Sequence, residues 1–201
     1  MDIVTIVLSE TWGQIVLGTA IAVAGALLRY AQKLRKEKRL NSVGHQVGTT
    51  VEVSKLLVEL RLNTSSARAY VAQLSNGVYY ANKVSQLKLT CTHSSVRDGI
   101  ADVVLNDSTL VSKLPNFFEL LVSEGCFCLT YEDVEDIALL HLFEMQGVYM
   151  MVVAPFYGTR NDVQGFVGID YLIDPTGDLD KEARCDIIKK YADRIGYTLK
   201  Q

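Results

Sequence analysis

The longest uncharged stretch of the chain covers residues 11–28, and a basic segment follows it directly. As a helix, this stretch would span about 27 Å at 1.5 Å per residue, close to the roughly 30 Å hydrocarbon core of a bilayer. Trp12 and Tyr30 flank it, where interfacial aromatic side chains are enriched. The pattern therefore predicts a transmembrane helix over residues 11–28, preceded by a short N-terminal segment, residues 1–10.

The basic juxtamembrane segment, residues 29–48, sets the predicted orientation. No lysine or arginine precedes the uncharged stretch, and a group of them follows it: Arg29, Lys33, Arg35, Lys36, Lys38 and Arg39. These side chains are expected to contact anionic lipid headgroups, and their position predicts that the rest of the chain is cytoplasmic. A cleaved signal peptide would carry its charge before the apolar run, so the pattern favours a single-pass protein of the inner membrane.

Small residues recur every four positions along the predicted membrane helix, at Gly18, Ala22 and Ala26. Such spacing lets two membrane helices approach closely. It predicts packing between copies of the chain, and hence a homo-oligomer. The alternative is that glycine and alanine are simply frequent in membrane helices.

From residue 49 onward the pattern is that of a folded domain. A helix is predicted over residues 50–62, because apolar side chains lie on one helical face: Val53, Leu56, Leu57 and Leu60. A strand is predicted over residues 68–74 and another over residues 84–91. Between them, Asn76-Gly77 has the sequence of a hairpin turn.

The middle of the domain is predicted from its helix start and stop signals. Pro115 begins a short amphipathic helix that Gly125 ends, and a strand follows over residues 126–130. Thr130-x-x-Asp133 has the form of a capping box for a helix that runs to about Gln146.

Two apolar strands and a terminal helix complete the predicted domain. The strands cover residues 148–156 and 164–173, and Asp178 is expected to cap the last helix. Hairpins and helices in this order predict an α+β domain over residues 49–201, in which helices flank a central antiparallel sheet.

The last third of the chain resembles the closing half of a GAF domain, a family related to PAS domains. The resemblance is carried by residues 147–156 (GVYMMVVAPF), by residues 164–171 (QGFVGIDY) and by the amphipathic helix that ends at residue 201. It implies a sensory or oligomerising module that binds a small ligand or a protein partner. Combined with the predicted membrane helix, it gives the leading hypothesis of a membrane-anchored, non-catalytic GAF-like protein.

Two alternatives to this hypothesis stay open. The chain as a whole resembles, more weakly, the T-type holins of tailed phages, which share its size, a single membrane helix near the N-terminus and a soluble α/β domain. This resemblance implies a lysis protein that oligomerises in the inner membrane, although the holin domain is periplasmic. The other alternative is a membrane-associated structural component of a phage virion or another assembly.

Charge excludes one class of partner. Residues 41–201 hold 14 basic and 20 acidic side chains, whereas nucleic-acid binding requires a basic surface. The apolar fraction of 49% and the charged fraction of 21% are those of a folded protein. We therefore expect a membrane, a second copy and a protein partner as contacts, and no nucleic acid.

Two short motifs, Cys91-Thr-His93 and Cys126-Phe-Cys128, supply metal-type ligands. Structural zinc sites usually space their cysteines as C-x₂₋₄-C, which neither motif does. Residues two apart on a strand share a face, so Cys126 and Cys128 can both point into the core. The sequence therefore predicts buried free thiols, with zinc as the lesser alternative, and no cofactor.

An acidic cluster follows the second motif and comprises Glu132, Asp133, Glu135 and Asp136. Carboxylates in a first helical turn complement the helix dipole, and the alternative is a surface for a cation or a basic partner. Asp170 lies on a predicted strand and could line the ligand side of the domain, so it joins this candidate surface. The three histidines belong to no catalytic motif, and no enzymatic activity is predicted.

Overall fold

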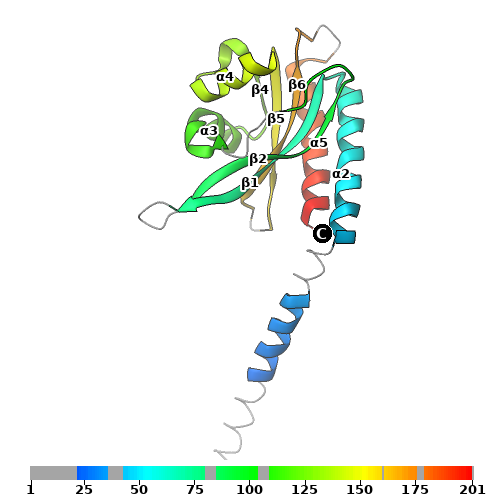
Figure 1. The fold of residues 1–201 in the computed structure, drawn as a ribbon, viewed down its shortest axis with the longest axis vertical. Helices are drawn as coiled ribbons and strands as arrows, with labels where there is room; N and C mark the ends of the chain where they lie inside the picture. The colour runs from blue at the N-terminus through cyan, green and yellow to red at the C-terminus, as the bar shows by residue number, and fades with distance from the viewer. Residues whose placement is uncertain are drawn as a thin grey trace, which may run out of the picture. The chain divides into compact units, whose positions relative to one another are not determined.

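A computed structural model describes residues 22–35, 43–79, 85–103, 109–159, 161–175 and 179–200 (Figure 1). The chain divides into two compact units, Met1–Gly48 and Thr49–Gln201. In the first unit, residues 22–35 form a helix whose side chains are exposed throughout. Among the helices that the structure describes, none combines the length and the apolar character that a bilayer span requires. Residues 11–21, most of the predicted span, lie outside the described part of the chain.

The second unit is built on one antiparallel sheet. Within the described residues this sheet has six strands in the order β3-β2-β1-β6-β5-β4. The strands are β1 (Arg68–Tyr79), β2 (Ser85–Val96), β3 (Thr109–Leu110), β4 (Phe127–Thr130), β5 (Met150–Tyr157) and β6 (Val163–Tyr171). The first and last long strands in the sequence, β1 and β6, pair at the centre of the sheet. The sheet is therefore complete only when both ends of the domain are present.

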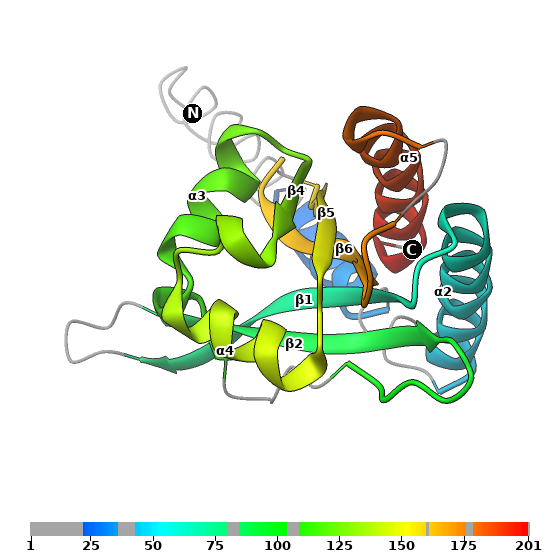
Figure 2. The ribbon, with the colours of Figure 1, turned by 90° about the horizontal axis from the view of Figure 1, so that it is seen from above.

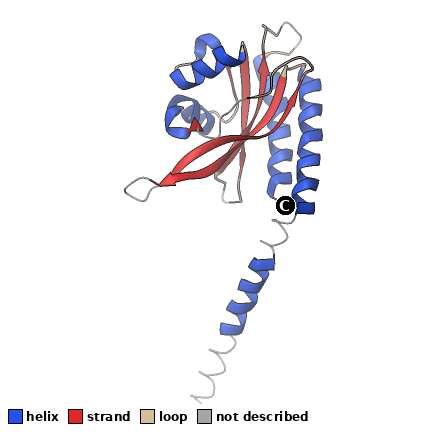
Figure 3. Ribbon diagram, in the orientation of Figure 1, coloured by secondary structure: helices blue, strands red, loops and turns tan. Residues whose placement is uncertain are grey.

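Helices cover both faces of this sheet, as Figures 1 and 2 show. One face carries α2 (Val43–Thr64) and α5 (Lys181–Lys200), and the other carries α3 (Pro115–Ser123) and α4 (Ile137–Gln146). Short 3-10 turns, Val111–Lys113 and Tyr131–Asp133, precede α3 and α4. Helices and strands are distinguished by colour in Figure 3. The arrangement is an α+β domain with a central antiparallel sheet flanked by helices, which is the predicted fold class.

Strand alternation divides the core into two clusters. In β5, Met150, Val152 and Ala154 pack toward α2 and α5, whereas Met151 and Val153 pack toward α3 and α4. This explains why the strand reads as a continuous apolar run, because helices bury both of its faces.

Several predicted elements are confirmed. The helix face formed by Val53, Leu56, Leu57 and Leu60 is buried against the sheet in α2. Pro115 begins α3 at its first turn, as its fixed φ favours. Gly147 ends α4 in the left-handed conformation with φ 61°, where a Cβ would be strained.

Three local predictions are wrong. Strand β1 continues through Asn76-Gly77 to Tyr79, and a register shift opposite β2 absorbs the pair as a β-bulge rather than a turn. The Thr130–Asp133 capping box exists, but it closes the Tyr131–Asp133 3-10 turn, and α4 begins later, at Ile137. Helix α5 is capped by Asp180, whose Oδ1 accepts from the Ala183 N–H at 2.7 Å, and Asp178 lies outside the described residues.

Candidate functional site

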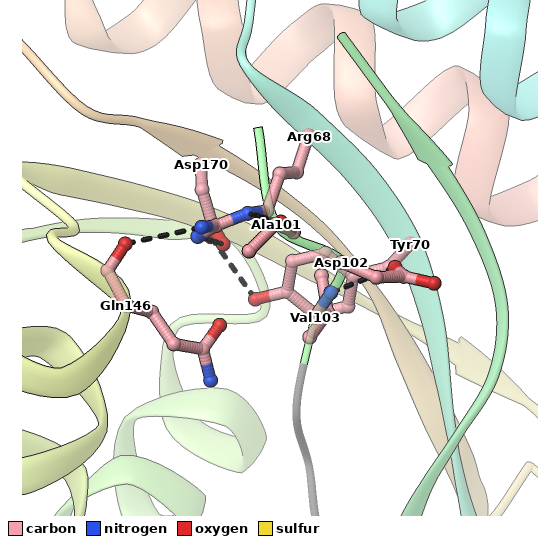
Figure 4. Close-up of polar contacts among 7 residues, drawn as sticks. All are labelled: Arg68, Tyr70, Ala101, Asp102, Val103, Gln146 and Asp170. Atoms are coloured by element: carbon pink, nitrogen blue, oxygen red, sulfur yellow. Dashed lines mark hydrogen bonds and ion pairs between the residues drawn. The ribbon is translucent and has the colours of Figure 1, made fainter. Parts of the chain in front are cut away.

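A buried ion pair stands at the centre of the sheet, on the face that α3 and α4 cover. Arg68 on β1 lies opposite Asp170 on β6 in the strand register, which places both side chains on the same face. Arg68 Nη1 is 3.6 Å from Asp170 Oδ2 (Figure 4), and each side chain is only 2% exposed. Ion pairs this deep are rare, because both charges lose their water.

The guanidinium of Arg68 also ties the sheet to its surroundings. Its Nε donates to the Ala101 carbonyl at 2.8 Å, and its Nη2 donates to the Gln146 carbonyl at 3.1 Å. Gln146 is the last residue of α4, so a cation meets the negative end of that helix. Among the residues that the structure describes, Arg68 Nη1 has no hydrogen-bond partner, and its only contact with an anion is the ion pair.

Tyr70 completes the network. It lies two residues after Arg68 on β1 and therefore on the same face of the sheet. Its hydroxyl donates to Asp170 Oδ1 at 3.2 Å. Its ring lies across Gly168, the register partner on β6, where an added Cβ would stand 2.5 Å from the ring. Glycine at position 168 therefore makes the room in which the tyrosine lies.

Burial changes the acidity of these groups. Desolvation raises the pKa of Asp170 to about 6, although Arg68 and the Tyr70 hydroxyl act in the opposite direction. The pKa of Tyr70 is also raised, mainly by burial and then by the charge of Asp170. The site therefore holds a carboxyl group that can gain or lose a proton near neutral pH.

A small cavity of about 20 Å³ adjoins the network. Its walls are mostly apolar, and polar groups reach it from Tyr70, Gln146 and Asp170. Among the apolar residues are Leu89, Leu114, Phe117, Leu139, Phe143 and Met151. A space of this size holds about one water molecule, far below the roughly 300–1,000 Å³ of a typical ligand pocket.

Solved structures of similar fold provide the comparison. The blue-light absorbing form of the Thermosynechococcus elongatus PixJ GAF domain superposes with a TM-score of 0.58 at 14% identity, covering 79% of this chain and 89% of that chain. The phycoerythrobilin-bound GAF domain of a cyanobacterial phytochrome gives 0.56 at 12% identity, covering 75% and 84% respectively. The fold is GAF-like.

At these identities the likeness extends to the fold alone. It covers far more of the chain than residues 147–201, from which the sequence resemblance was drawn. The sequence itself matches no known protein family and no curated protein. The predicted GAF-like fold is thus confirmed, and the pairing of β1 with β6 shows why the early strand belongs to it.

The structure separates the residues of the predicted acidic surface. Asp170 is buried in the network, whereas Glu132, Asp133 and Glu135 are exposed near the start of α4 and do not line the same cavity. Asp133 Oδ2 accepts from the Thr130 hydroxyl at 2.6 Å and from its N–H at 3.0 Å. These hydrogen bonds lower the pKa of Asp133, so its main contacts are with its own turn.

Asp136 is not a surface residue, contrary to its predicted place in the acidic cluster. It is 6% exposed, and its Oδ2 accepts from the Phe117 N–H at 2.8 Å. Its Oδ1 accepts from the Asn116 N–H at 3.3 Å. The carboxylate therefore caps the first turn of α3 from a distant part of the chain, which a local pattern does not reveal.

The four residues of the alternative zinc site do not come together in the GAF-like domain. Cys91 and His93 lie on β2, and Cys126 and Cys128 lie at β4, with β1, β6 and β5 between them. No group of three potential ligands that could hold a metal ion occurs in the described part of the chain. Burial raises the pKa of Cys91 to about 12, so this thiol stays protonated.

The structure describes only some of the residues of the predicted membrane anchor. Gly18, Lys36, Lys38 and Arg39 lie outside the described residues, whereas Ala22, Ala26, Arg29, Lys33 and Arg35 lie in the helix over residues 22–35. That helix exposes all of its side chains within its own unit. Helix packing and lipid contact at these positions therefore stay predictions.

Sequence reasoning missed Arg68, Tyr70 and Cys185. Arg68 and Tyr70 lie two residues apart on β1, so they share a face of the strand. Asp170 interrupts the apolar run of β6. A basic residue at the start of one strand and an acidic residue within another were the signal that could have paired them. The position of Cys185 on α5 gave no such signal.

Proposed function

We propose that this protein is a non-catalytic GAF-like binding module, anchored in the inner membrane, that self-associates and takes a small ligand between the sheet and the α3–α4 layer. One observation carries the ligand site: a buried carboxylate, Asp170, lies at the wall of an apolar cavity. Apolar pockets with a few convergent polar groups and a shifted pKa are the usual form of a small-molecule site.

The chemistry of Asp170 indicates the class of ligand. Its carboxylate is 3.2 Å from the Tyr70 hydroxyl and 3.6 Å from Arg68 Nη1, whereas charge-assisted hydrogen bonds are about 2.5–2.9 Å long. An ionised carboxylate also offers about four acceptor positions. The site therefore favours a small, mostly apolar molecule with one N–H or O–H donor that faces Asp170.

Ligand entry requires the cavity to widen, because it now has room for about one water. The helices that form its outer wall, α3 and α4, are short, and they meet the cavity through Phe117, Leu139 and Phe143. Displacement of this layer from the sheet would open the space. The bilins named with two of the similar structures, phycoerythrobilin and phycocyanobilin, are ligands of those proteins, and the class inferred here is much smaller.

Methionine NMR tests the ligand site. Met151 lines the cavity, whereas its neighbour Met150 packs toward α2 and α5, so ¹³C-methyl labelling places a reporter and its control on adjacent residues. Indole carries an N–H donor, and benzofuran has the same shape without it. Indole should shift the Met151 signal and leave the Met150 signal in place, and benzofuran should act more weakly.

A double variant, Arg68→Met with Asp170→Leu, removes the acceptor without leaving a buried charge unpaired. It should abolish the difference between indole and benzofuran. Equal responses to both probes in the wild-type chain, or no response at Met151, would contradict the proposed site.

The membrane part of the proposal rests on the uncharged stretch over residues 11–28 and its basic flank. Carbonate extraction of membranes should leave the full chain in the pellet. A cysteine introduced at exposed Lys200 should react with a membrane-impermeant maleimide only after the cells are lysed. Labelling in intact cells would place the domain on the opposite side, and full release by carbonate would contradict the anchor.

Self-association is supported by an outward-facing apolar stripe on α2. Val51, Val58 and Leu62 share one side of the helix at spacings of seven and four residues, and they are 48%, 42% and 63% exposed. A membrane tether keeps copies concentrated and aligned, which makes a second copy the expected occupant. Small residues at Gly18, Ala22 and Ala26 would add contacts in the bilayer.

The mass of the full chain in detergent, measured by light scattering, tests self-association. Val58→Lys should reduce the oligomeric fraction about tenfold. Val122→Lys, the same change at an exposed position of α3, should have no effect. A monomeric wild-type chain would overturn this part of the proposal.

The holin-like alternative predicts a different result on expression. A lysis protein would collapse the membrane potential abruptly, and Gly18→Leu would abolish that collapse by blocking helix packing. A binding module should leave the potential unchanged at the same expression level. A potential-sensitive dye measures both outcomes in growing cells.

A further inference from the structure

Three of the four cysteines gather on the face of the sheet opposite the cavity. Cys126 precedes β4 and Cys128 lies within it, so strand alternation turns both toward α5, while Phe127 and Leu129 turn toward α3 and α4. Cys185 lies on α5 and packs against the same cluster. All three are free and partly exposed.

The contacts within this group are close. The Cys126 sulfur lies 3.7 Å from the carbonyl oxygen of Cys185, and the Cys128 sulfur lies 3.7 Å from the carbonyl oxygen of Lys181. The two thiols are also the main influences on the pKa of Cys185. Cys185 therefore lies near two potential partners, one just before the edge strand β4 and one within it.

The groups around Cys185 favour its thiolate form. The nearby Cys126 and Cys128 thiols, and after them the positive charge of Lys189, lower the pKa of Cys185. The pKa values of Cys126 and Cys128 are raised, chiefly by the neighbouring Cys185 side chain and then by burial. Reactive cysteines are found in such electropositive, partly exposed surroundings, with a protonated partner at hand.

We propose that Cys126, Cys128 and Cys185 form a redox-responsive site, in which a hydroperoxide oxidises Cys185 and one of the other two thiols captures it as a disulfide between β4 and α5. Nothing in this site depends on the ligand cavity, which lies on the other face of the sheet.

The chemistry balances in two steps. The Cys185 sulfur attacks the O–O bond, an S–O bond forms, and the leaving oxygen takes a proton to give an alcohol, or water in the case of hydrogen peroxide. The thiol of Cys126 or Cys128 then attacks the sulfenic acid, an S–S bond forms and water leaves. Overall, two thiols lose two electrons and two protons, and the hydroperoxide is reduced.

A disulfide at this place would crosslink the edge strand β4, or the residue directly before it, to helix α5. In the described residues β4 pairs with β5 alone, and it leads through the Tyr131–Asp133 turn toward α4. The crosslink would join positions 59 or 57 residues apart, 126 or 128 with 185. It should therefore raise the urea concentration at half-unfolding. In a reducing cytoplasm such a bond would form transiently.

Peptide mapping tests the proposal on the full chain. The reduced protein is exposed to a small excess of hydrogen peroxide, the remaining thiols are blocked with N-ethylmaleimide, and tryptic peptides are analysed without reduction. Trypsin releases Cys185 on residues 185–189, and Cys126 and Cys128 share another peptide. We expect one intramolecular disulfide between these peptides, formed more than tenfold faster than any oxidation of Cys91.

Single variants separate the two partners. Cys126→Ser and Cys128→Ser should each still form a disulfide through the remaining thiol, whereas Cys185→Ser should form none. When both Cys126 and Cys128 are serine, dimedone should trap a sulfenic acid at Cys185. Cys91→Ser is the matched control and should behave as wild type.

Three results would overturn the proposal: oxidation of all four thiols at one rate, disulfides only between chains, or disulfide formation that survives Cys185→Ser. Circular dichroism of each variant confirms that it is folded. Serine is close in size to cysteine, so a loss of reaction in a folded variant reports chemistry rather than structure.

Discussion

On one face of the sheet, two long helices, α2 and α5, pack through aliphatic side chains such as Leu57, Ile188 and Ile195. On the other face, two shorter helices, α3 and α4, pack around the Arg68–Asp170 ion pair and a small cavity. The polar contacts of the first face that join α2 to α5 lie at its margin, as in the Asn63–Tyr191 hydrogen bond of 2.8 Å and the exposed Glu59–Arg194 pair.

This difference indicates that one face supports the fold and that the other can change its conformation. An aliphatic interface between long elements resists local change, because every displaced side chain loses close contacts. A face that holds buried charge, a small cavity and short helices can rearrange when a ligand supplies new hydrogen bonds. We therefore expect the α2–α5 face to carry the fold and the α3–α4 face to carry the ligand response.

The largest expected effect comes from breaking the buried ion pair. Asp170→Leu leaves the Arg68 charge buried without its counter-ion and should reduce the free energy of unfolding by about 3–5 kcal/mol. Adding Arg68→Met should recover most of the lost free energy of unfolding, since it removes the unpaired charge. Urea denaturation measures the free energy of unfolding of both variants. An equal loss in the single and double variants would show that the unpaired charge of Arg68 is not its cause.

The same pair predicts a dependence on pH. Burial raises the pKa of Asp170 to about 6 in the folded chain, against about 3.9 for an unfolded one. The folded state then holds this proton more tightly than the unfolded state. The stability from this group is therefore fully present below about pH 4 and is lost as the pH rises through about 6.

Comparison with Asp170→Asn isolates this effect from the other carboxylates. Between about pH 4.5 and about pH 7.5, the wild-type chain should lose on the order of 2 kcal/mol of unfolding free energy relative to that variant. Urea unfolding at the two pH values measures the difference. A difference that stays constant, or that grows in the opposite direction, would refute the assignment of a raised pKa.

A third prediction concerns the close approach at Gly168. An alanine Cβ there would stand 2.5 Å from the Tyr70 ring, so Gly168→Ala should cost about 1–3 kcal/mol through overpacking. Combining it with Tyr70→Leu should recover part of this cost, because the ring is gone. Additive losses in thermal unfolding would show that the two positions do not interact.

The long-range cap of α3 gives a smaller effect. Asp136→Ala removes the acceptor for the Phe117 and Asn116 N–H groups and should cost about 0.5–2 kcal/mol. Hydrogen exchange should speed up in the first turn of α3 and stay unchanged in α5. Uniform acceleration across both helices would instead indicate a global effect.

The smallest effect is expected at the margin of the α2–α5 face. Arg194→Ala breaks an exposed pair with Glu59 that is 3.9 Å long, and it should change the unfolding free energy by less than about 1 kcal/mol. A loss as large as that of Asp170→Leu would erase the proposed contrast between the two faces. Urea denaturation under the same conditions makes the comparison direct.

Much of the fold could be predicted from the sequence, because its signals are local. The apolar face of α2 and the end of α4 at Gly147 follow from helix periodicity and from the conformational freedom of glycine. The patterns of β5 and β6 likewise predicted two strands, and the structure pairs them with each other. At Asn76-Gly77 the local signal failed, since the pairing of β1 with β2 beyond it turned a hairpin sequence into a bulge.

The candidate sites were decided by the tertiary structure. Residues about a hundred positions apart, Arg68 and Asp170, meet only because β1 and β6 pair in one register, and no local pattern encodes a register between distant strands. Cys185 joins Cys126 and Cys128 only because α5 packs on the face to which β4 turns its cysteines. The sequence by itself determined which segments are helices and strands and which of their faces are apolar. Their packing determined which polar side chains share a site, because burial and charge pairing depend on neighbours that the chain brings together only when it folds.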